Sequence, residues 1–429
     1  MNEFDLALGI DQNTLNKAIS AIYSKTHNNI FMGSFGIDVH GITAAITWDI
    51  SKPPMLDLNY SARADAVLPE IFGKLQIFKD ISKESIVKTT ASLKAATFSM
   101  IIPAITLTLK LPVGQPSVTF SANVLCQAQI NQNGQIELAA IHLDLDTSKS
   151  KLDFLDQIIN SLSDPVLHAA NNALKGIHIP TINAEGITLG YPVAVVSGGR
   201  LIVLVNLASK GSPSPTTASW PNEAVFCLAS KELINEVVRN NYNMGKIPHQ
   251  VSDRGSKDLG ITTAYYNAAL QVGAPNIGMA GADFLISLGL GGNVAAGFKT
   301  ILGNFGLNYM AVIDPNPLSC KVRLSVDSSR QLVVSIPSIP SAKVLLKPQG
   351  NVAETILSTL NAVQANIMSL ILSTLLPRII QSINVPVVKI PSIPVDIGNI
   401  HVKIQANNLR VGSFNGMALV AGNLEVIDA

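Results

Sequence analysis

Charged side chains are scarce in this sequence: Asp, Glu, Lys and Arg make up 14% of its 429 residues, whereas hydrophobic residues make up 47%. This composition differs from that of disordered chains and is poor in charge for a soluble domain. The formal net charge is +1, and Lys and Arg form no cluster. We therefore expect no nucleic-acid partner and no electrostatic anchoring to anionic lipid. The chain must bury much apolar surface or use it for binding.

Cysteine and paired histidine are also scarce. The three cysteines, Cys126, Cys227 and Cys320, lie far apart in apolar, strand-like segments. We expect buried free thiols, with a disulfide as the less favoured alternative. The seven histidines include no His-x-His or His-x-x-x-His pair. No metal site and no cofactor are therefore predicted.

Known catalytic motifs are missing as well. The chain has no Gly-x-Ser-x-Gly elbow. Residues 289–292 lack the glycine spacing of a dinucleotide-binding loop, which favours strand bending or close backbone approach. Asp144 and Asp146 lie two apart on a predicted strand beside His142, and a solvated strand face is favoured over a paired-carboxylate site. No catalytic residue is predicted, and an enzyme is the least favoured class of function.

Long uninterrupted apolar runs and a secretory signal are absent too. The most apolar stretch, 356–380, contains Asn361, Gln364 and Pro377, so it predicts a buried amphipathic helix instead of a membrane span. Residues 1–5 lack the basic and apolar regions of a signal peptide. We expect a protein that stays where it is made, a mature form, or export by a non-classical route.

The opening pattern of the chain returns once, about half the chain later. In both places a predicted strand leads into a predicted helix, with Asp11 and Ser230 as the expected N-caps. The same offset separates two pairs of equivalent residues: Leu8 and Phe226, and Leu15 and Leu233. A strand and helix repeated at a constant offset indicate an internal duplication.

The duplication predicts two domains, which is also what a chain of this length favours. Residues 209–222 are rich in Ser, Pro and Thr without apolar periodicity, which predicts a linker or crossover. We therefore expect a first half over 1–208 and a second half over 223–429.

Long alternating strands dominate the first half. Residues 37–50 change the parity of their alternation at Gly41, which predicts a bulge or bend within one strand. An unbroken alternation over 118–130 predicts a strand of roughly 40 Å. The Asn-Gly pair at 133–134 predicts a hairpin back into 136–146.

Two long apolar helices are expected to cover these strands. The first, over 152–174, contains Pro165, which predicts a kink or a restart. The second begins at a capping box, 351–354, and stops or bends at Pro377. In the second half, 246–258 predicts a polar loop. The predicted strands there are 261–272, 284–290, 307–313, 322–326, 332–336, 402–406 and 417–426.

This duplicated plan resembles the tubular lipid-binding (TULIP) superfamily. Its members include the bactericidal/permeability-increasing, lipopolysaccharide-binding and cholesteryl-ester transfer proteins, and TULIP-type proteins of clostridial toxin gene clusters. The resemblance covers nearly the whole chain. Its residues are the paired openings, 8–22 and 226–238, and the paired closings around Gly190 and Gly412.

The resemblance implies an α+β fold of two tandem halves, each a long, bent antiparallel sheet wrapped around a short N-terminal and a long C-terminal helix. It also implies an apolar tunnel for acyl chains. Carried over by position, the lipid-binding residues would be Leu15, Ile19, Ile22, Leu155, Ile159 and Leu162 in the first half. In the second half they would be Leu233, Val237, Leu360, Val363 and Ile367. The alternative is that these residues are ordinary core contacts with no cavity between them.

Three features depart from the animal members of that family. Cys126 is the only cysteine in the first half, so their disulfide is absent, and neither a basic tip nor a secretory signal is present. The bacterial toxin-cluster branch, or another bacterial branch, fits these absences better.

We therefore expect a non-enzymatic protein that binds or transfers lipid or another elongated apolar ligand, with transient membrane contact. The alternative is a toxin-accessory or protein-interaction protein that keeps the fold, fills its tunnel with side chains and has a protein partner. A fold by itself does not distinguish these functions.

Overall fold

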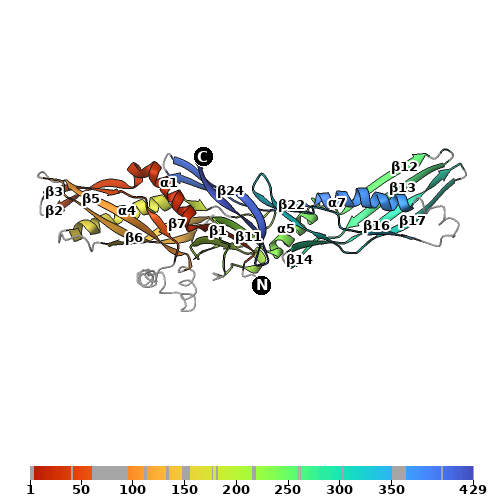
Figure 1. The fold of residues 1–429 in the computed structure, drawn as a ribbon, viewed down its shortest axis with the longest axis horizontal. Coiled ribbons are helices and arrows are strands. Elements are labelled where there is room, and N and C mark those ends of the chain that lie inside the picture. Colours follow the sequence, from red (N-terminus) through yellow and green to blue (C-terminus); the bar gives the residue numbers. More distant parts are fainter. Residues whose placement is uncertain are drawn as a thin grey trace.

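The computed structural model describes residues 4–428 apart from 40–41, 60–94, 111–113, 132–134, 147–154, 176, 180–181, 215–218, 259, 261, 282, 302, 350–363 and 398–399. The molecule is elongated, with one sheet in the middle and a long curled antiparallel sheet toward each end (Figure 1). Both chain termini lie in the middle part. The expected α+β class is confirmed as a mostly-β fold whose described part contains four helices longer than a single turn.

The central sheet contains strands from both predicted halves, in the order β23-β24-β25-β11-β1-β10-β9. β1 (Leu6–Asp11) pairs antiparallel with β10 (Arg200–Val205) on one side and with β11 (Val225–Ala229) on the other. The remaining strands are β9 (Val193–Ser197), β23 (Ile393–Ile397), β24 (Ile400–Phe414) and β25 (Met417–Asp428). The two strands of the repeated opening pattern therefore lie side by side.

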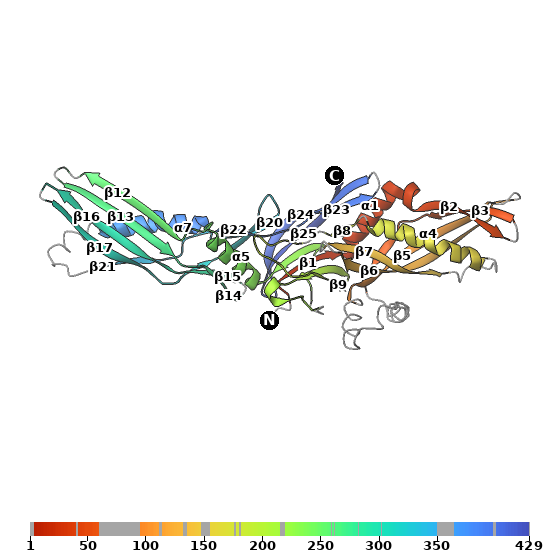
Figure 2. The same cartoon turned by 180° about the vertical axis from the view of Figure 1, so that it is seen from behind.

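The first outer sheet has the order β2-β3-β5-β6-β7-β8, with β4 paired to β5. Its strands are β2 (Met32–Val39), β3 (Ile42–Ile50), β4 (Met55–Asp57), β5 (Thr97–Lys110), β6 (Ser117–Ile130), β7 (Ile136–Asp146) and β8 (His178–Ile179). Two helices, α1 (Gln12–Ile30) and α4 (Leu155–Lys175), contact each other and pack against this sheet (Figure 2).

The second outer sheet has the order β12-β13-β16-β17-β21, and two smaller sheets, β14-β15-β18 and β19-β20-β22, lie between it and the central sheet. The strands are β12 (Gln250–Asp258), β13 (Thr262–Val272), β14 (Asn276–Ala280), β15 (Asp283–Leu288), β16 (Leu290–Thr300), β17 (Gly303–Asp314), β18 (Leu318–Lys321), β19 (Arg323–Val326), β20 (Gln331–Ser335), β21 (Lys343–Pro348) and β22 (Asn384–Lys389). The helices are α5 (Lys231–Asn243) and a helix over 364–382 that includes the π-helical segment η3 (Ile371–Leu375) and α7 (Leu376–Ser382).

Both helices of the repeated pattern begin at the predicted caps. The Asp11 carboxylate accepts a hydrogen bond from the backbone N of Thr14 at 2.8 Å, and the Ser230 hydroxyl accepts one from the backbone N of Leu233 at 3.1 Å. These bonds satisfy donors that the helix itself leaves free. The apolar stripes that follow expose at most 2% of each residue: Leu15, Ala18, Ile19, Ile22, Leu233, Ile234, Val237 and Val238.

The predicted single bent strand over 37–50 is wrong, because the chain reverses direction there. β2 and β3 are antiparallel, with Val39 opposite Ile42. Residues directly opposite each other in such a pair share one face of the sheet. An odd-numbered residue of β2 therefore shares a face with an even-numbered residue of β3, which is the change of parity that the sequence displays at Gly41.

The predicted polar loop over 246–258 is also largely wrong, because most of it forms β12. This strand pairs with β13 from Gln250 to Asp258, and among the described strands it is the edge strand of its sheet. Edge strands of natural sheets often carry charged residues, which discourage pairing with another chain. The polar composition thus marks a sheet edge instead of a loop.

The first predicted long strand and its hairpin are confirmed. β6 covers Ser117–Ile130, and the backbone N of Asn131 donates to the carbonyl of Gln135 at 2.9 Å where the chain turns toward β7. The pairing of β6 with β7 shifts register between Leu125 and Cys126. Leu125 and Cys126 are both buried, although they are neighbours on one strand.

The two helix prolines act differently. α4 is one helix from Leu155 to Lys175, so the predicted restart at Pro165 does not occur. Beyond Pro377 the second helix continues to Ser382, and η3 ends just before this proline. Because proline lacks an N–H donor, a wider local hydrogen-bonding pattern accommodates it within a continuous helix. The predicted capping box, 351–354, lies outside the described residues.

Candidate functional site

Each outer sheet has one apolar face directed toward the helices, which we call its inner face. Along β6, alternate residues on this face are buried from Cys126 to Phe120, whereas Val118 is half-buried. β7 shows the same change, from buried Leu138 to half-buried Leu143 and Leu145. The less buried residues lie toward the end of the sheet that carries the β2–β3 hairpin. The inner face therefore stays apolar where solvent begins to reach it.

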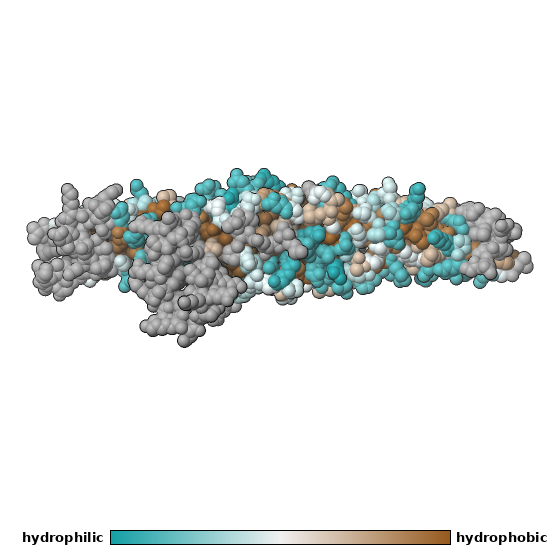
Figure 3. Space-filling view, turned by 90° about the horizontal axis from the view of Figure 1, so that it is seen from below, coloured by the Kyte–Doolittle hydropathy of each residue, from teal (hydrophilic) through white to brown (hydrophobic). Residues whose placement is uncertain are grey.

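The second outer sheet repeats this arrangement. On β17, Ile313, Ala311 and Tyr309 are buried, Leu307 is half-buried, and Phe305 is 54% exposed. Residues at every second position of a strand share a face, so these five form one row from the middle of the molecule to its end. In Figure 3, apolar residues reach the surface at several places along the molecule.

The structure places the predicted lipid-binding residues as follows. Those that expose at most 2% of their surface are Leu15, Ile19, Ile22, Leu162, Leu233, Val237 and Ile367. Leu155 and Ile159 belong to α4, but their side chains lie outside the described part, as do Leu360 and Val363 altogether. The expected contact between the two helices of the first half is present, since α1 contacts α4. Residues of a packed core and residues of a tunnel wall are both buried. The role of these side chains in lining a tunnel therefore stays a prediction.

Tyr309 is an interior residue that the sequence analysis did not single out. Its side chain is fully buried, and its hydroxyl has no hydrogen-bond partner in the described structure. On β13 of the same sheet, the hydroxyl of Tyr266 donates to Asp253 at 2.9 Å, and burial together with Asp253 raises the pKa of Tyr266. An unpaired buried hydroxyl is unfavourable by about 1–3 kcal/mol. The only sequence signal for Tyr309 is a polar atom within an otherwise apolar alternation.

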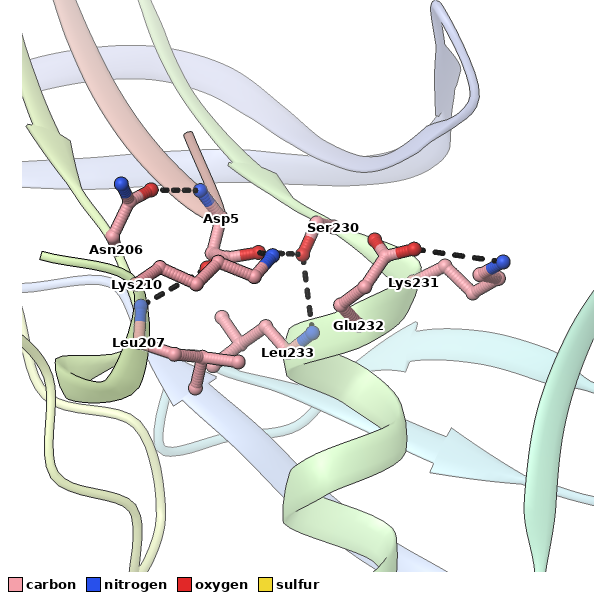
Figure 4. Close-up of polar contacts among 8 residues, drawn as sticks. All are labelled: Asp5, Asn206, Leu207, Lys210, Ser230, Lys231, Glu232 and Leu233. Carbon is pink, nitrogen blue, oxygen red and sulfur yellow. Dashed lines mark hydrogen bonds and ion pairs between the residues drawn. The ribbon is translucent and has the colours of Figure 1, made fainter. Parts of the chain in front are cut away.

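A buried polar cluster joins the first strand to the start of the second half (Figure 4). The Asp5 carboxylate accepts hydrogen bonds from Lys210 Nζ at 2.7 Å, from Ser230 Oγ at 2.9 Å and from the backbone N of Leu207 at 3.0 Å. The backbone N of Asp5 donates to Asn206 Oδ1 at 3.1 Å. Because the carboxylate is bonded to groups of this chain, we assign the cluster a structural role.

The expected free thiols are confirmed. Cys126, Cys227 and Cys320 are unpaired and buried. Burial raises the pKa of Cys126, that of Cys227 to about 12 and that of Cys320 to about 11. A thiol that stays protonated at neutral pH is a poor nucleophile, so these cysteines are inert core residues.

Because burial raises the pKa of these thiols, we expect the protein to lose stability at alkaline pH. An unfolded thiol with a pKa of 9.0 loses its proton as the pH rises, whereas folded Cys227 keeps its proton up to about pH 12. The unfolded state then binds fewer protons, so each such thiol lowers the free energy of unfolding by about 1.4 kcal/mol per pH unit above 9. Urea titrations should show that the free energy of unfolding declines less between pH 9 and 11 in Cys227→Ala than in the wild type. An equal decline in both proteins would contradict the assignment.

The remaining polar candidates lie where the sequence suggested. His142 and Asp146 are exposed and Asp144 is half-buried, as on a solvated strand face. Residues 290–292 form the start of β16, and a side chain on Gly292 would strike the backbone of β13. Among the described residues, no group of three His, Cys, Asp or Glu is placed to hold a metal ion. Within the same part of the chain, no helix is long and apolar enough to cross a membrane.

Comparison with known proteins gave matches to solved structures only. No protein-family model matches the chain, and no curated protein matches it. The crystal structure of P47 of Clostridium botulinum E1 matches with a TM-score of 0.48 and 10% identity, covering 99% of both chains. P47 from Clostridium botulinum A2 matches with a TM-score of 0.44 and 10% identity, over 98% of this chain and 97% of that one.

Lipopolysaccharide binding protein matches with a TM-score of 0.34 and 10% identity, over 98% of this chain and 99% of that one. The full-length likeness to P47 and to lipopolysaccharide binding protein is the resemblance that the sequence led us to expect.

Proposed function

We propose that this chain is a non-enzymatic protein that binds or transfers lipid or another elongated apolar ligand. Its halves, 1–208 and 223–429, would each form a TULIP-like unit in which a sheet wraps around a short and a long helix, with 209–222 as the linker or crossover. The observation that supports this proposal most is the continuation of both inner faces, still apolar, toward the solvent-accessible ends of the sheets.

The dimensions of the inner face suit an acyl chain. Cys126 and Val118 are eight positions apart along β6, which corresponds to about 27 Å of strand. A bilayer hydrocarbon core of about 30 Å holds two layers of acyl chains, so one chain is shorter than this row. Burial of a dozen methylenes at about 0.8 kcal/mol each supplies roughly 10 kcal/mol before ordering costs. Affinity of this size needs no charged residue.

Mass spectrometry tests the proposal directly. Organic extracts of the purified protein should contain acyl lipid, and a native mass spectrum should show it bound in near-stoichiometric amount. The lipid headgroup would then identify the ligand class. A clean ligand-free mass that stays unchanged after incubation with mixed lipid vesicles would contradict the proposal and favour the protein-partner alternative.

Filling the inner face should reduce bound lipid. Leu307→Trp adds bulk at a half-buried inner position of β17, where the row still has access to solvent. We expect it to lower the lipid content of the second half markedly, with little change in the melting temperature. Asn308→Trp is the matched control, because Asn308 is the exposed neighbour on the opposite face. Equal lipid content in Leu307→Trp, Asn308→Trp and wild type would argue against binding at this face.

A further inference from the structure

A polar groove lies where the central sheet meets the β19-β20-β22 sheet, away from both inner faces. Its volume is about 560 Å³, which is within the size range of small-ligand sites. One wall is the turn between β19 and β20, 326–330, together with Lys389 at the end of β22. The other wall is the segment 405–409 of β24, which includes the irregularity in its pairing with β25. Segments far apart in the sequence thus form one site.

The charges that line the groove favour an anion. Arg330 and Lys389 line it, and among the described residues neither has a carboxylate partner. Asp327 is the one acidic residue of the lining. Its Oδ1 accepts hydrogen bonds from the backbone N of Ser329 at 2.9 Å and of Gln331 at 2.8 Å. This carboxylate is therefore engaged in forming the turn, and the lining carries one more cation than anion.

Two buried polar atoms of the residues that line the groove have no hydrogen-bond partner within the part of the chain that the structure describes. They are Nη1 of Arg330, a donor, and Oδ1 of Asn407, an acceptor. The amide of Asn407 is oriented by its Nδ2, which donates to Glu425 Oε2 at 3.0 Å. Leaving buried donors and acceptors unpaired is unfavourable. A ligand in the groove that accepts a hydrogen bond from Arg330 and donates one to Asn407 would satisfy both atoms.

We propose that this groove binds a phosphorylated polyol, such as a phosphoglycerol group. The phosphate accepts hydrogen bonds from Arg330, whose guanidinium donors match the spacing of phosphate oxygens. The positive charge of Lys389 also attracts it. A hydroxyl next to the phosphate donates to Oδ1 of Asn407. A single ligand thus supplies the acceptor that Nη1 of Arg330 lacks and the donor that Oδ1 of Asn407 lacks. The inference does not depend on lipid binding at the inner faces.

The test is calorimetric titration of the full chain with glycerol 3-phosphate, inorganic phosphate and glycerol. Arg330→Gly is the diagnostic variant. Arg330 has a φ of 63°, a backbone conformation that glycine adopts without strain, so this variant removes the guanidinium and keeps the turn. We expect about tenfold weaker or lost binding of glycerol 3-phosphate. Lys347→Gln, which removes an exposed lysine of β21, should bind as the wild type does.

A vesicle-binding experiment distinguishes a lipid headgroup from a free phosphorylated polyol as the ligand. Wild-type binding to phosphatidylglycerol vesicles but not to phosphatidylcholine vesicles, lost in Arg330→Gly, would assign the groove to a lipid headgroup. Binding of soluble glycerol 3-phosphate without vesicle binding would assign it to a free phosphorylated polyol. The proposal is overturned if the wild type binds none of these probes, or if Arg330→Gly binds them unchanged. Equal affinity for inorganic phosphate and glycerol 3-phosphate would overturn the role of Asn407.

Discussion

Replacement of Asp5 by alanine is expected to lower the free energy of unfolding by about 3–5 kcal/mol. The Asp5 side chain is 1% exposed and accepts from two buried donors, Ser230 Oγ and the backbone N of Leu207. Alanine leaves both donors without an acceptor in a place that water does not reach. Lys210 loses its partner as well, but its side chain is 43% exposed and becomes hydrated. Urea unfolding followed by circular dichroism measures the change.

Asp11→Ala is the matched control for this prediction. Asp11 is also a carboxylate near the end of β1, but it is half-buried and makes a single capping bond to Thr14. Loss of such a cap is expected to cost about 1 kcal/mol. If Asp5→Ala destabilises the protein no more than Asp11→Ala does, the buried cluster does not hold the first strand to the second half as we infer.

Replacement of Gly292 by alanine should destabilise the second outer sheet by about 3 kcal/mol or more. A Cβ atom at this position would overlap the carbonyl oxygen of Ala269 and lie 3.0 Å from the Cα of Leu270. Both atoms belong to the backbone of β13, so no side-chain rotation relieves the overlap. β13 and β16 would have to separate around the pair of Leu270 and Gly292, with loss of nearby hydrogen bonds. Thermal unfolding and amide hydrogen exchange in these strands measure the effect.

Gly36→Ala provides the comparison within a strand. Gly36 lies in β2, and a Cβ atom there would have no neighbour within 4 Å. Its replacement is expected to change the free energy of unfolding by less than about 1 kcal/mol. Similar melting temperatures for Gly292→Ala and Gly36→Ala would show that the close approach of β13 and β16 does not limit the residue at position 292.

Features set by neighbouring residues were predictable from the sequence. The caps Asp11 and Ser230 hydrogen-bond to residues three positions away, and the alternation along β6 follows from the geometry of one strand. The predictions from the sequence were wrong where strand pairing decides whether a segment is a strand, a bend or a loop. β12 has a polar sequence but is a strand because β13 aligns along its whole length. The parity change at Gly41 is equally compatible with a bend and a hairpin until the partners of β3 are known.

In the candidate sites, too, the sequence predicted features that depend on neighbouring residues and missed those that depend on residues distant in the chain. The sequence placed Leu15 and Leu233 on buried helix faces, because apolar periodicity marks the face that turns away from water. It did not indicate Tyr309, whose buried hydroxyl has no hydrogen-bond partner among the described residues. Nor did it indicate the groove, in which Arg330, Lys389 and Asn407 come from three separate segments.

By itself, the amino-acid sequence determined a charge-poor α+β chain with two capped helices and long alternating strands, because these features depend on residues close together along the chain. Only the tertiary structure decided that β1 lies between β10 and β11 and that Asp5 is buried against Lys210 and Ser230. It also decided that Arg330 and Asn407, each with a buried polar atom unpartnered among the described residues, line one groove. The physical reason is that each of these contacts joins distant residues, and their free energies depend on burial and pairing that exist only in the folded chain.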